Sequence, residues 1–158
     1  VAGGLPVVAA GGLALRADVE RVGAQGAAGA MLGTRFVATV ESGAHDDYKT
    51  ALVAADSRAT ALTVCFDGDW PQAPHRVLRN RTLELWEAAG RPARGHRPGE
   101  DSPPAVRSGR AIARYDDSPP RAGDEGAVGE MCLYAGEGCG AIDDVPTVAR
   151  LIDRLAPR

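Results

Sequence analysis

The chain has few aromatic residues, few cysteines, a single lysine and no long apolar run. Aromatic residues make up 4% of its 158 residues, and the cysteines number three. No stretch reaches the roughly 18 uncharged apolar residues that a membrane-spanning helix needs. Cys65, Cys132 and Cys139 form neither a CxxC pair nor a metal-ligand spacing. The sequence therefore predicts reduced thiols, no metal site and a cytoplasmic location.

The charges are nearly balanced. Eighteen basic residues stand against 21 acidic ones, which gives a formal net charge of -3. This balance gives no electrostatic reason to expect nucleic acid or an anionic membrane as a partner. The chain starts at Val1 and enters an apolar run almost at once, so we expect it to be a piece of a longer protein or a processed chain.

The first third of the sequence has the order strand, helix, strand. Leu5 to Ala10 is a continuous apolar run, as in a parallel strand buried on both faces. Residues 17–25 have the apolar spacing of a short helix, and 26–33 form a second short apolar run. Short joints between these elements predict a right-handed crossover between two parallel strands.

The remaining two thirds are expected to be mostly helical, apart from one strand. Ser42 is the expected cap of a helix from Ala44 to Ala55, and Pro146 lies in the first turn of the last helix. Residues 91–125 are rich in Pro, Gly, Arg and Asp, which predicts a loop or lid. The other expected elements are a strand at 61–66 and helices at 75–90 and 145–155.

Two glycine turns follow the two predicted strands. Gly11 and Gly12 come after the first strand, and Gly33 and Thr34 come after the second. In a parallel α/β fold both turns lie at the carboxyl ends of neighbouring strands, where ligands bind. Glycine lets the main chain approach an anion closely, and the N–H groups at the following helix start would point toward it. Each turn alone is most simply a tight turn, but the pair indicates a phosphate site.

Several segments resemble the nitronate monooxygenase family. They are "PVVAAGGLA", "GAMLGTRFVATVES", "AHDDYKTAL", "LRNRTLELWE" and "LYAGEGCGAIDDVPTVARLIDRL". The resemblance implies a TIM-barrel enzyme that binds FMN and oxidises alkyl nitronates with O2. It also implies that the main chain at Gly12 binds the FMN phosphate, with Gly11 shaping the same turn. Met31, Leu32, Gly33 and Thr34 match the stretch that supplies the second wall of this site.

The sequence departs from that family in two respects. The histidine that serves as catalytic base in better-known members would precede Val1, so no catalytic residue is assigned. Glu137 stands where relatives usually have Gln, which puts the substrate preference in question.

The other polar candidates have structural explanations. His45 is expected at a helix start, and His75 and His96 are expected at the surface. Arg35 is expected either in an ion pair or beside the anion.

The sequence predicts an α/β fold, namely the C-terminal part of a (β/α)8 TIM barrel with its last two β–α units and a helical extension. Residues 1–60 would end the FMN-binding barrel, 61–128 would form an inserted lid, and 129–158 would pack back on the barrel. Two strands leave unpaired edges, so the remaining barrel strands must come from elsewhere.

Three alternative functions remain open. A flavin-dependent enoyl-acyl carrier protein reductase shares the "AAGG" turn and would use NAD(P)H. An enzyme like IMP dehydrogenase has a similar turn, although the "ES…H…YK" run argues against it. A truncated, non-catalytic remnant would carry the motifs without their function.

Overall fold

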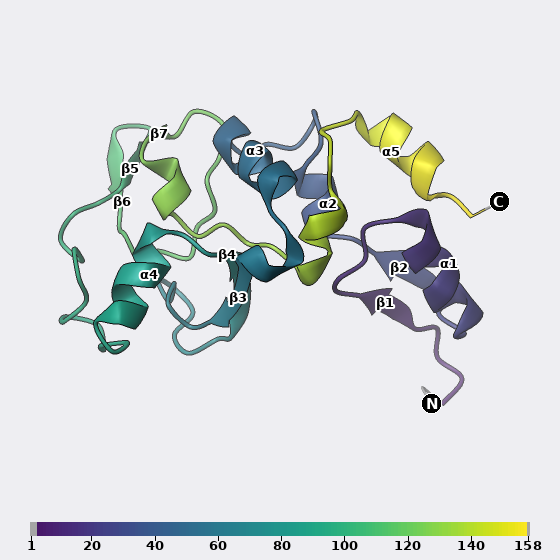
Figure 1. Cartoon of the computed structure of the whole chain (residues 1–158), viewed down its shortest axis with the longest axis horizontal. Coiled ribbons are helices and arrows are strands. Elements are labelled where there is room, and N and C mark those ends of the chain that lie inside the picture. The colour runs from purple at the N-terminus through teal and green to yellow at the C-terminus, as the bar shows by residue number, and fades with distance from the viewer. Residues whose placement is uncertain (1–2, 158) are drawn as a thin grey trace.

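The computed structural model describes residues 3–157, which form an elongated molecule with two ends of different construction. At one end lie the strands β1 (Val8–Ala10) and β2 (Gly29–Met31) with the helix α1 (Arg16–Ala24) between them in sequence. The helix α5 (Val148–Leu155) packs beside α1, so the two termini lie at this same end (Figure 1).

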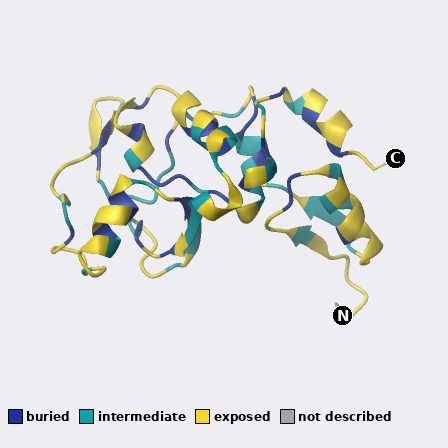
Figure 2. Ribbon diagram, viewed as in Figure 1, coloured by how far each residue is buried: buried dark blue, intermediate teal, exposed yellow. Residues whose placement is uncertain are grey.

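The predicted β–α–β unit is present, but its strands are short and exposed. β1 and β2 pair in parallel, with Ala9 opposite Ala30 and Ala10 opposite Met31. Within residues 3–157 the first strand is not buried on both faces, because Val8 is 58% exposed and the sheet contains β1 and β2 alone. Figure 2 shows the same contrast between this two-stranded sheet and the buried residues of the middle and the opposite end.

The middle of the molecule is built around the helix α3 (Asp46–Ala54), which follows the short helix α2 (Thr34–Val37). Tyr48 and Leu52 of α3 pack with Leu133, Cys139 and Ile142 in one buried cluster. The predicted cap Ser42 is wrong, because the Nδ1 atom of His45 accepts the N–H of Asp47 and the helix begins at Asp46. Ser42 instead accepts the N–H of Ala44 at 3.2 Å.

The far end contains more strands than expected. The 3₁₀ helix η1 (Ser57–Ala59) leads into β3 (Thr60–Thr63), which pairs antiparallel with β4 (His75–Leu78). A third sheet has the order β6–β5–β7 and is formed by β5 (Ala105–Arg107), β6 (Arg110–Ile112) and β7 (Glu125–Gly126). The expected mostly helical C-terminal part is therefore wrong.

The predicted helix at 75–90 is divided into a strand and a helix. Its first residues form β4, because the main chain there bonds to β3 on one side and to Leu133 and Ala135 on the other. The helix α4 (Arg81–Ala88) begins only after Asn80, whose side chain accepts the N–H of Leu83 at 3.1 Å. An N-cap of this kind favours a helix start at that point.

The expected loop at 91–125 includes the β5–β6 hairpin and is joined to the rest of the chain by partly buried ion pairs. Arg97 bonds both carboxylate oxygens of Asp67, at 2.7 and 2.6 Å. Asp124 accepts from Arg107 at 2.8 and 2.7 Å and from the N–H of Arg121 at 2.8 Å. After this segment come the 3₁₀ helices η2 (Val128–Glu130) and η3 (Glu137–Ala141), and then α5, which begins after its cap Thr147, so that Pro146 precedes the helix.

We expect Asp124→Asn to reduce the free energy of unfolding at neutral pH by about 2–3 kcal/mol, because it removes the charged partner of Arg107. The hydrogen bond from Arg107 lowers the pKa of Asp124 below its ordinary value. The ionised pair therefore stabilises the fold above the pKa of the unfolded state, and this contribution is lost as the pH falls through the lower folded pKa.

The measurement is urea unfolding of the wild type and Asp124→Asn from neutral to acid pH. Exposed Asp153, changed to Asn, is the control. The difference in the free energy of unfolding between the wild type and Asp124→Asn should disappear at acid pH. A difference that does not change with pH would contradict the explanation.

Candidate glycine cup at the ends of the parallel strands

The two glycine turns lie side by side and line one cavity of about 280 Å³. The parallel register places Ala10 opposite Met31, so the chain leaves both strands at the same edge of the sheet. We call this cavity the glycine cup. Its lining residues are Ala10, Gly11, Gly12, Leu13, Met31, Gly33, Thr34, Gly136, Gly138 and Ile142. Five of the six predicted cofactor residues are among them, and Leu32 is not.

The first turn requires glycine because of its backbone conformation. Gly11 has a φ of +91° and Gly12 a φ of +68°, in the left-handed region that other residues rarely adopt. A Cβ atom built on either glycine would meet nothing within 4 Å. The main chain of this turn is therefore open to a ligand on the side that a side chain would otherwise cover.

A third loop closes the cup, and the sequence did not assign it there. The N–H of Gly136 donates to the Thr34 hydroxyl oxygen at 2.9 Å, across 102 positions of the sequence. A Cβ on Gly138 would lie 2.7 Å from the carbonyl oxygen of Gly12, which is closer than any side chain allows. The glycines of "YAGEGCG" therefore permit η3 to approach the first turn, and their alternate spacing was the available signal.

The donors of the cup fit an anionic group. Gly12, Gly33 and Thr34 donate no main-chain hydrogen bond to another residue between 3 and 157. Because Thr34 already accepts from Gly136, its hydroxyl hydrogen remains free to donate. None of the described lining residues is charged, so an anion would be held by main-chain dipoles and by this hydroxyl.

The N-terminus of α1 does not offer the N–H groups of Ala14 and Leu15 to an anion in the cup, although the sequence predicts that N–H groups there point toward it. The carboxylate of Asp18 accepts the N–H groups of Ala14 and Leu15, at 2.9 and 3.0 Å. These two bonds lower the pKa of Asp18, so a negative charge already occupies this helix end. An anion in the cup would therefore use the turns themselves and not the N-terminus of α1.

Arg35 is a structural residue. It bonds the Asp144 carboxylate at 2.6 Å and the carbonyl oxygen of Ala38 at 3.3 Å, with its side chain 5% exposed. Of the two roles expected for it, the structure shows the ion pair. The same carboxylate also accepts from Arg154, and the bonds from Arg154 and Arg35 lower the pKa of Asp144.

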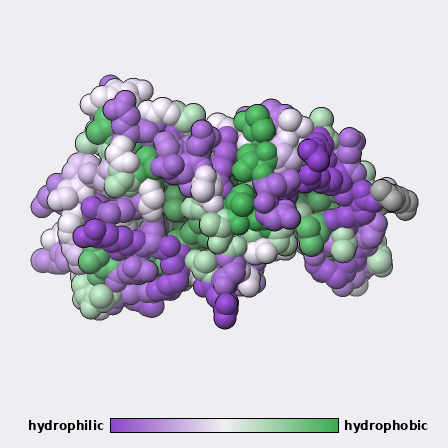
Figure 3. Space-filling model, turned by 45° about the horizontal axis from the view of Figure 1, so that its top comes forward, coloured by the Kyte–Doolittle hydropathy of each residue, from purple (hydrophilic) through white to green (hydrophobic). Residues whose placement is uncertain are grey.

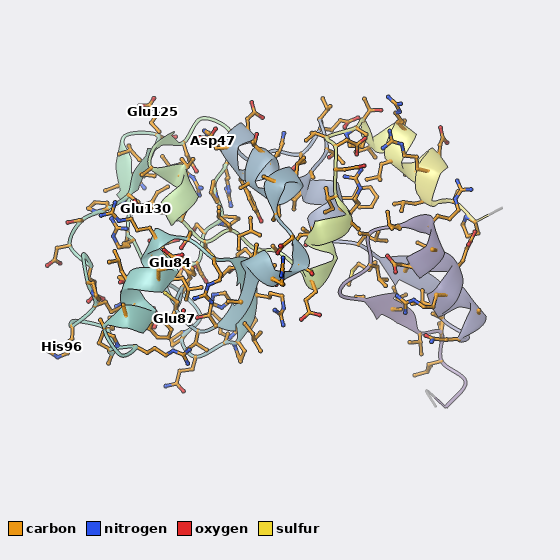
Figure 4. All side chains as sticks on the ribbon, viewed as in Figure 1. Asp47, Glu84, Glu87, His96, Glu125 and Glu130 are labelled. Carbon is orange, nitrogen blue, oxygen red and sulfur yellow. The ribbon has the colours of Figure 1, made fainter. Side chains whose placement is uncertain are left out.

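None of the three histidines lines the cup. His45 caps α3, as expected for a helix start. His96 is exposed at the far end, as Figure 4 shows. The expected surface position of His75 is wrong, because the residue is half-buried and its Nε2 atom is inaccessible to solvent.

Glu137 and Cys139 of the third loop are both engaged in interactions with other residues of the chain. Glu137 forms an ion pair with Arg76 at 2.7 Å, and its side chain is largely exposed. The Cys139 thiol is buried and donates to the carbonyl oxygen of Asp56 at 3.4 Å. Burial raises the pKa of this thiol, which makes it a poor nucleophile.

Two other kinds of site, a metal cluster and a membrane-spanning helix, are absent from the part of the chain that the structure describes. Within residues 3–157 no group of three or more His, Cys, Asp or Glu side chains is arranged to hold a metal ion. No helix in that range has the length and apolar character to cross a membrane. The face shown in Figure 3 is largely hydrophilic, with apolar residues gathered near its middle.

Comparison with known proteins decides the family. The sequence model described as nitronate monooxygenase matches residues 1–158. The chain belongs to the nitronate monooxygenase family. This membership confirms the resemblance seen in the sequence motifs.

The matches to curated relatives cover only part of this chain and a smaller part of each relative. A dehydrogenase of Mycobacterium tuberculosis, named for a hydroxy-methyl-oxo-octahydroindene-carboxyl-CoA, is 41% identical over 92 residues, or 58% of this chain and 24% of its own. A nitronate monooxygenase of Paraburkholderia phytofirmans is 41% identical over 64 residues, or 40% of this chain and 18% of its own. The chain thus matches about a quarter or less of the length of these relatives.

Solved structures are similar over nearly the whole chain. FabK from Thermotoga maritima has a TM-score of 0.64 and 28% identity, covering 96% of this chain and 43% of its own. Nitroalkane oxidase from Streptomyces ansochromogenes has a TM-score of 0.64 and 31% identity, covering 96% and 38%. The α/β character is shared, and residues 3–157 contain no closed barrel.

Proposed function

We propose that the glycine cup binds the phosphate of FMN in an enzyme that oxidises alkyl nitronates with O2. The observation that carries this proposal is the meeting of three glycine loops at the carboxyl ends of two parallel strands. Phosphates of barrel enzymes are frequently bound by the loops after the last two strands. Membership of the nitronate monooxygenase family supports the flavin-dependent oxidoreductase class.

The residues of the cup would position the cofactor and not carry out the chemistry. The N–H groups of Gly12, Gly33 and Thr34 would donate to phosphate oxygens, and Gly138 would hold the third loop against the first turn. The bound flavin would supply the electron transfer between the nitronate and O2. No described residue of the cup can exchange a proton near neutral pH, so we assign no catalytic base to this chain.

The division of the chain follows the same proposal. Residues 1–60 would complete the flavin-binding barrel, with the exposed faces of β1 and β2 covered by its other strands. Residues 61–128 would form a lid. Residues 129–158 would pack back on the barrel, with η3 against the glycine cup and α5 against α1. Arg16 of α1 stabilises the packing of α5, because its side chain donates to the carbonyl oxygens of Arg154 and Asp153 at 2.8 and 3.0 Å.

Oxygen consumption by the flavoprotein that contains this chain, supplied with an alkyl nitronate and no NADH, tests the activity. We expect uptake of O2 that requires both the nitronate and the bound flavin. A flavoprotein with no nitronate-dependent uptake would contradict the proposed reaction and leave the cofactor site standing. Absence of the visible flavin spectrum from the purified protein would contradict the cofactor site itself.

A second candidate is a dehydrogenase that acts on a bulky CoA thioester. Two relatives with that name, from Mycobacterium tuberculosis and Rhodococcus jostii, are 41% and 37% identical over 92 and 86 residues. Such an enzyme, like the enoyl-acyl carrier protein reductase alternative, would pass electrons to or from a second organic substrate. Nicotinamide-dependent turnover of a thioester without O2 uptake would favour this candidate.

A further inference from the structure

A second cavity, of about 330 Å³, gathers aromatic side chains, and none of its lining residues lines the glycine cup. We call it the aromatic pocket. Phe66, Trp70 and Tyr134 line it together with His75 and Asp117. With aromatic residues at 4% of the sequence, this concentration of rings in one cavity is a distinctive feature of the chain.

The rings form walls at different angles. The His75 ring is next to both Phe66 and Tyr134, with centroids 6.1 and 5.6 Å away and planes inclined by 53° and 66°. Burial, the neighbouring Cys132 and the charges of Asp117 and Asp116 raise the pKa of Tyr134, which therefore keeps its neutral ring. Trp70 is 73% exposed, although tryptophan is usually well buried.

The charges at the aromatic pocket have one sign. Asp117 lines it, and none of its described lining residues is Lys or Arg. The loop before Trp70 packs directly on the same acidic segment, because a Cβ on Gly68 would lie 3.1 Å from the N atom of Asp117 and 3.2 Å from the Cα of Asp116. An anionic ligand would be repelled here, whereas a cation would be attracted.

His75 lines the same wall and has a buried ring nitrogen without a hydrogen-bond partner among residues 3–157. Its Nδ1 atom lies 2.9 Å from the carbonyl oxygen of Ala73, so we assign the ring hydrogen to Nδ1. The Nε2 atom then presents a lone pair, and it is buried without a hydrogen-bond partner among residues 3–157.

We propose that the aromatic pocket binds the head of an alkylated ammonium compound, such as a trimethylammonium group. The π faces of Trp, Tyr and Phe attract a cation electrostatically, most strongly for Trp, and the Asp117 carboxylate adds a charge. A cavity of this size suits a small organic head group, and an exposed Trp70 would be covered by it. The site is separate from the FMN proposal and does not depend on it.

Calorimetric titration of the chain with choline tests the pocket, with dimethylbutanol as the uncharged carbon isostere. We expect saturable binding of choline and at least about tenfold weaker binding of the isostere, because only the charge differs. Equal affinities would overturn the proposal in favour of a plain apolar site, and absence of saturable choline binding would overturn it outright.

Variants locate the binding. Trp70→Leu should weaken choline binding about 3- to 30-fold and Trp70→Phe by less, since phenylalanine keeps a ring face. Asp117→Asn should also weaken it, whereas Asp143→Asn, which removes an exposed carboxylate elsewhere, should not. Trp70 is largely exposed, so its variants should fold, and unchanged far-UV circular dichroism checks this. Choline binding that Trp70→Leu leaves unaltered would contradict the assignment.

Discussion

We expect Gly12→Val to weaken the FMN binding proposed for the glycine cup at least about 100-fold. Gly12 has a φ of +68°, and its open side faces no other group within 4 Å. A valine there would place a branched side chain where the phosphate is proposed to approach. It would also strain the turn by about 1–3 kcal/mol, because β-branched residues rarely adopt positive φ.

Gly109→Val separates these two effects. Gly109 has a φ of +76° in the turn between β5 and β6, and a Cβ there also meets nothing within 4 Å. The strain is therefore matched, but the glycine cup is untouched. Flavin titration followed by absorbance should show loss of binding in Gly12→Val alone. Equal flavin occupancy in both variants would contradict the assignment of Gly12.

The isolated chain of 158 residues should bind FMN weakly or not at all. Two parallel strands cannot close a barrel, and the glycine cup of about 280 Å³ lies just below the range of pockets that enclose whole ligands, roughly 300–1,000 Å³. The hydrogen-bond donors for the phosphate would be present, but most of the residues that line the pocket of the flavin ring would be missing. The affinity should be at least about 100-fold lower than in a protein with the complete barrel.

Fluorescence quenching of FMN measures this affinity directly. The same titration is carried out on a protein in which these residues are joined to the further strands of a complete barrel. Riboflavin, which lacks the phosphate, serves as a control for the cup, because weak binding that depends on the phosphate should disappear with it. Tight one-to-one binding of FMN by the isolated chain would contradict the prediction that the remaining strands are needed.

The positions of the two glycine turns could be predicted because they depend on local pattern and a general rule. An apolar run ending in Gly11, and a second ending in Gly33, indicate strand ends whatever surrounds them. Parallel pairing then places both ends at one edge of a sheet. The use of these turns as a phosphate site stays a prediction.

Other features could not be predicted from local pattern. Residues 75–78 have good helical spacing with the segment that follows, but hydrogen bonds to β3 and to the chain around Leu133 make them a strand. This strand moves His75 from an expected surface position into the wall of the aromatic pocket. Tertiary packing overrides intrinsic propensity here, because the propensity differences are well under the energy of a paired, buried strand.

The amino-acid sequence by itself determined the family, the β–α–β start and the two glycine turns. Each of these depends on residues close together in the chain, where side-chain type limits φ, ψ and periodicity. Only the tertiary structure decided that η3 closes the glycine cup across 102 positions, that Arg35 is committed to Asp144, and that three aromatic rings share one cavity. Such contacts depend on how distant segments pack, and packing is a property of the whole set of buried surfaces.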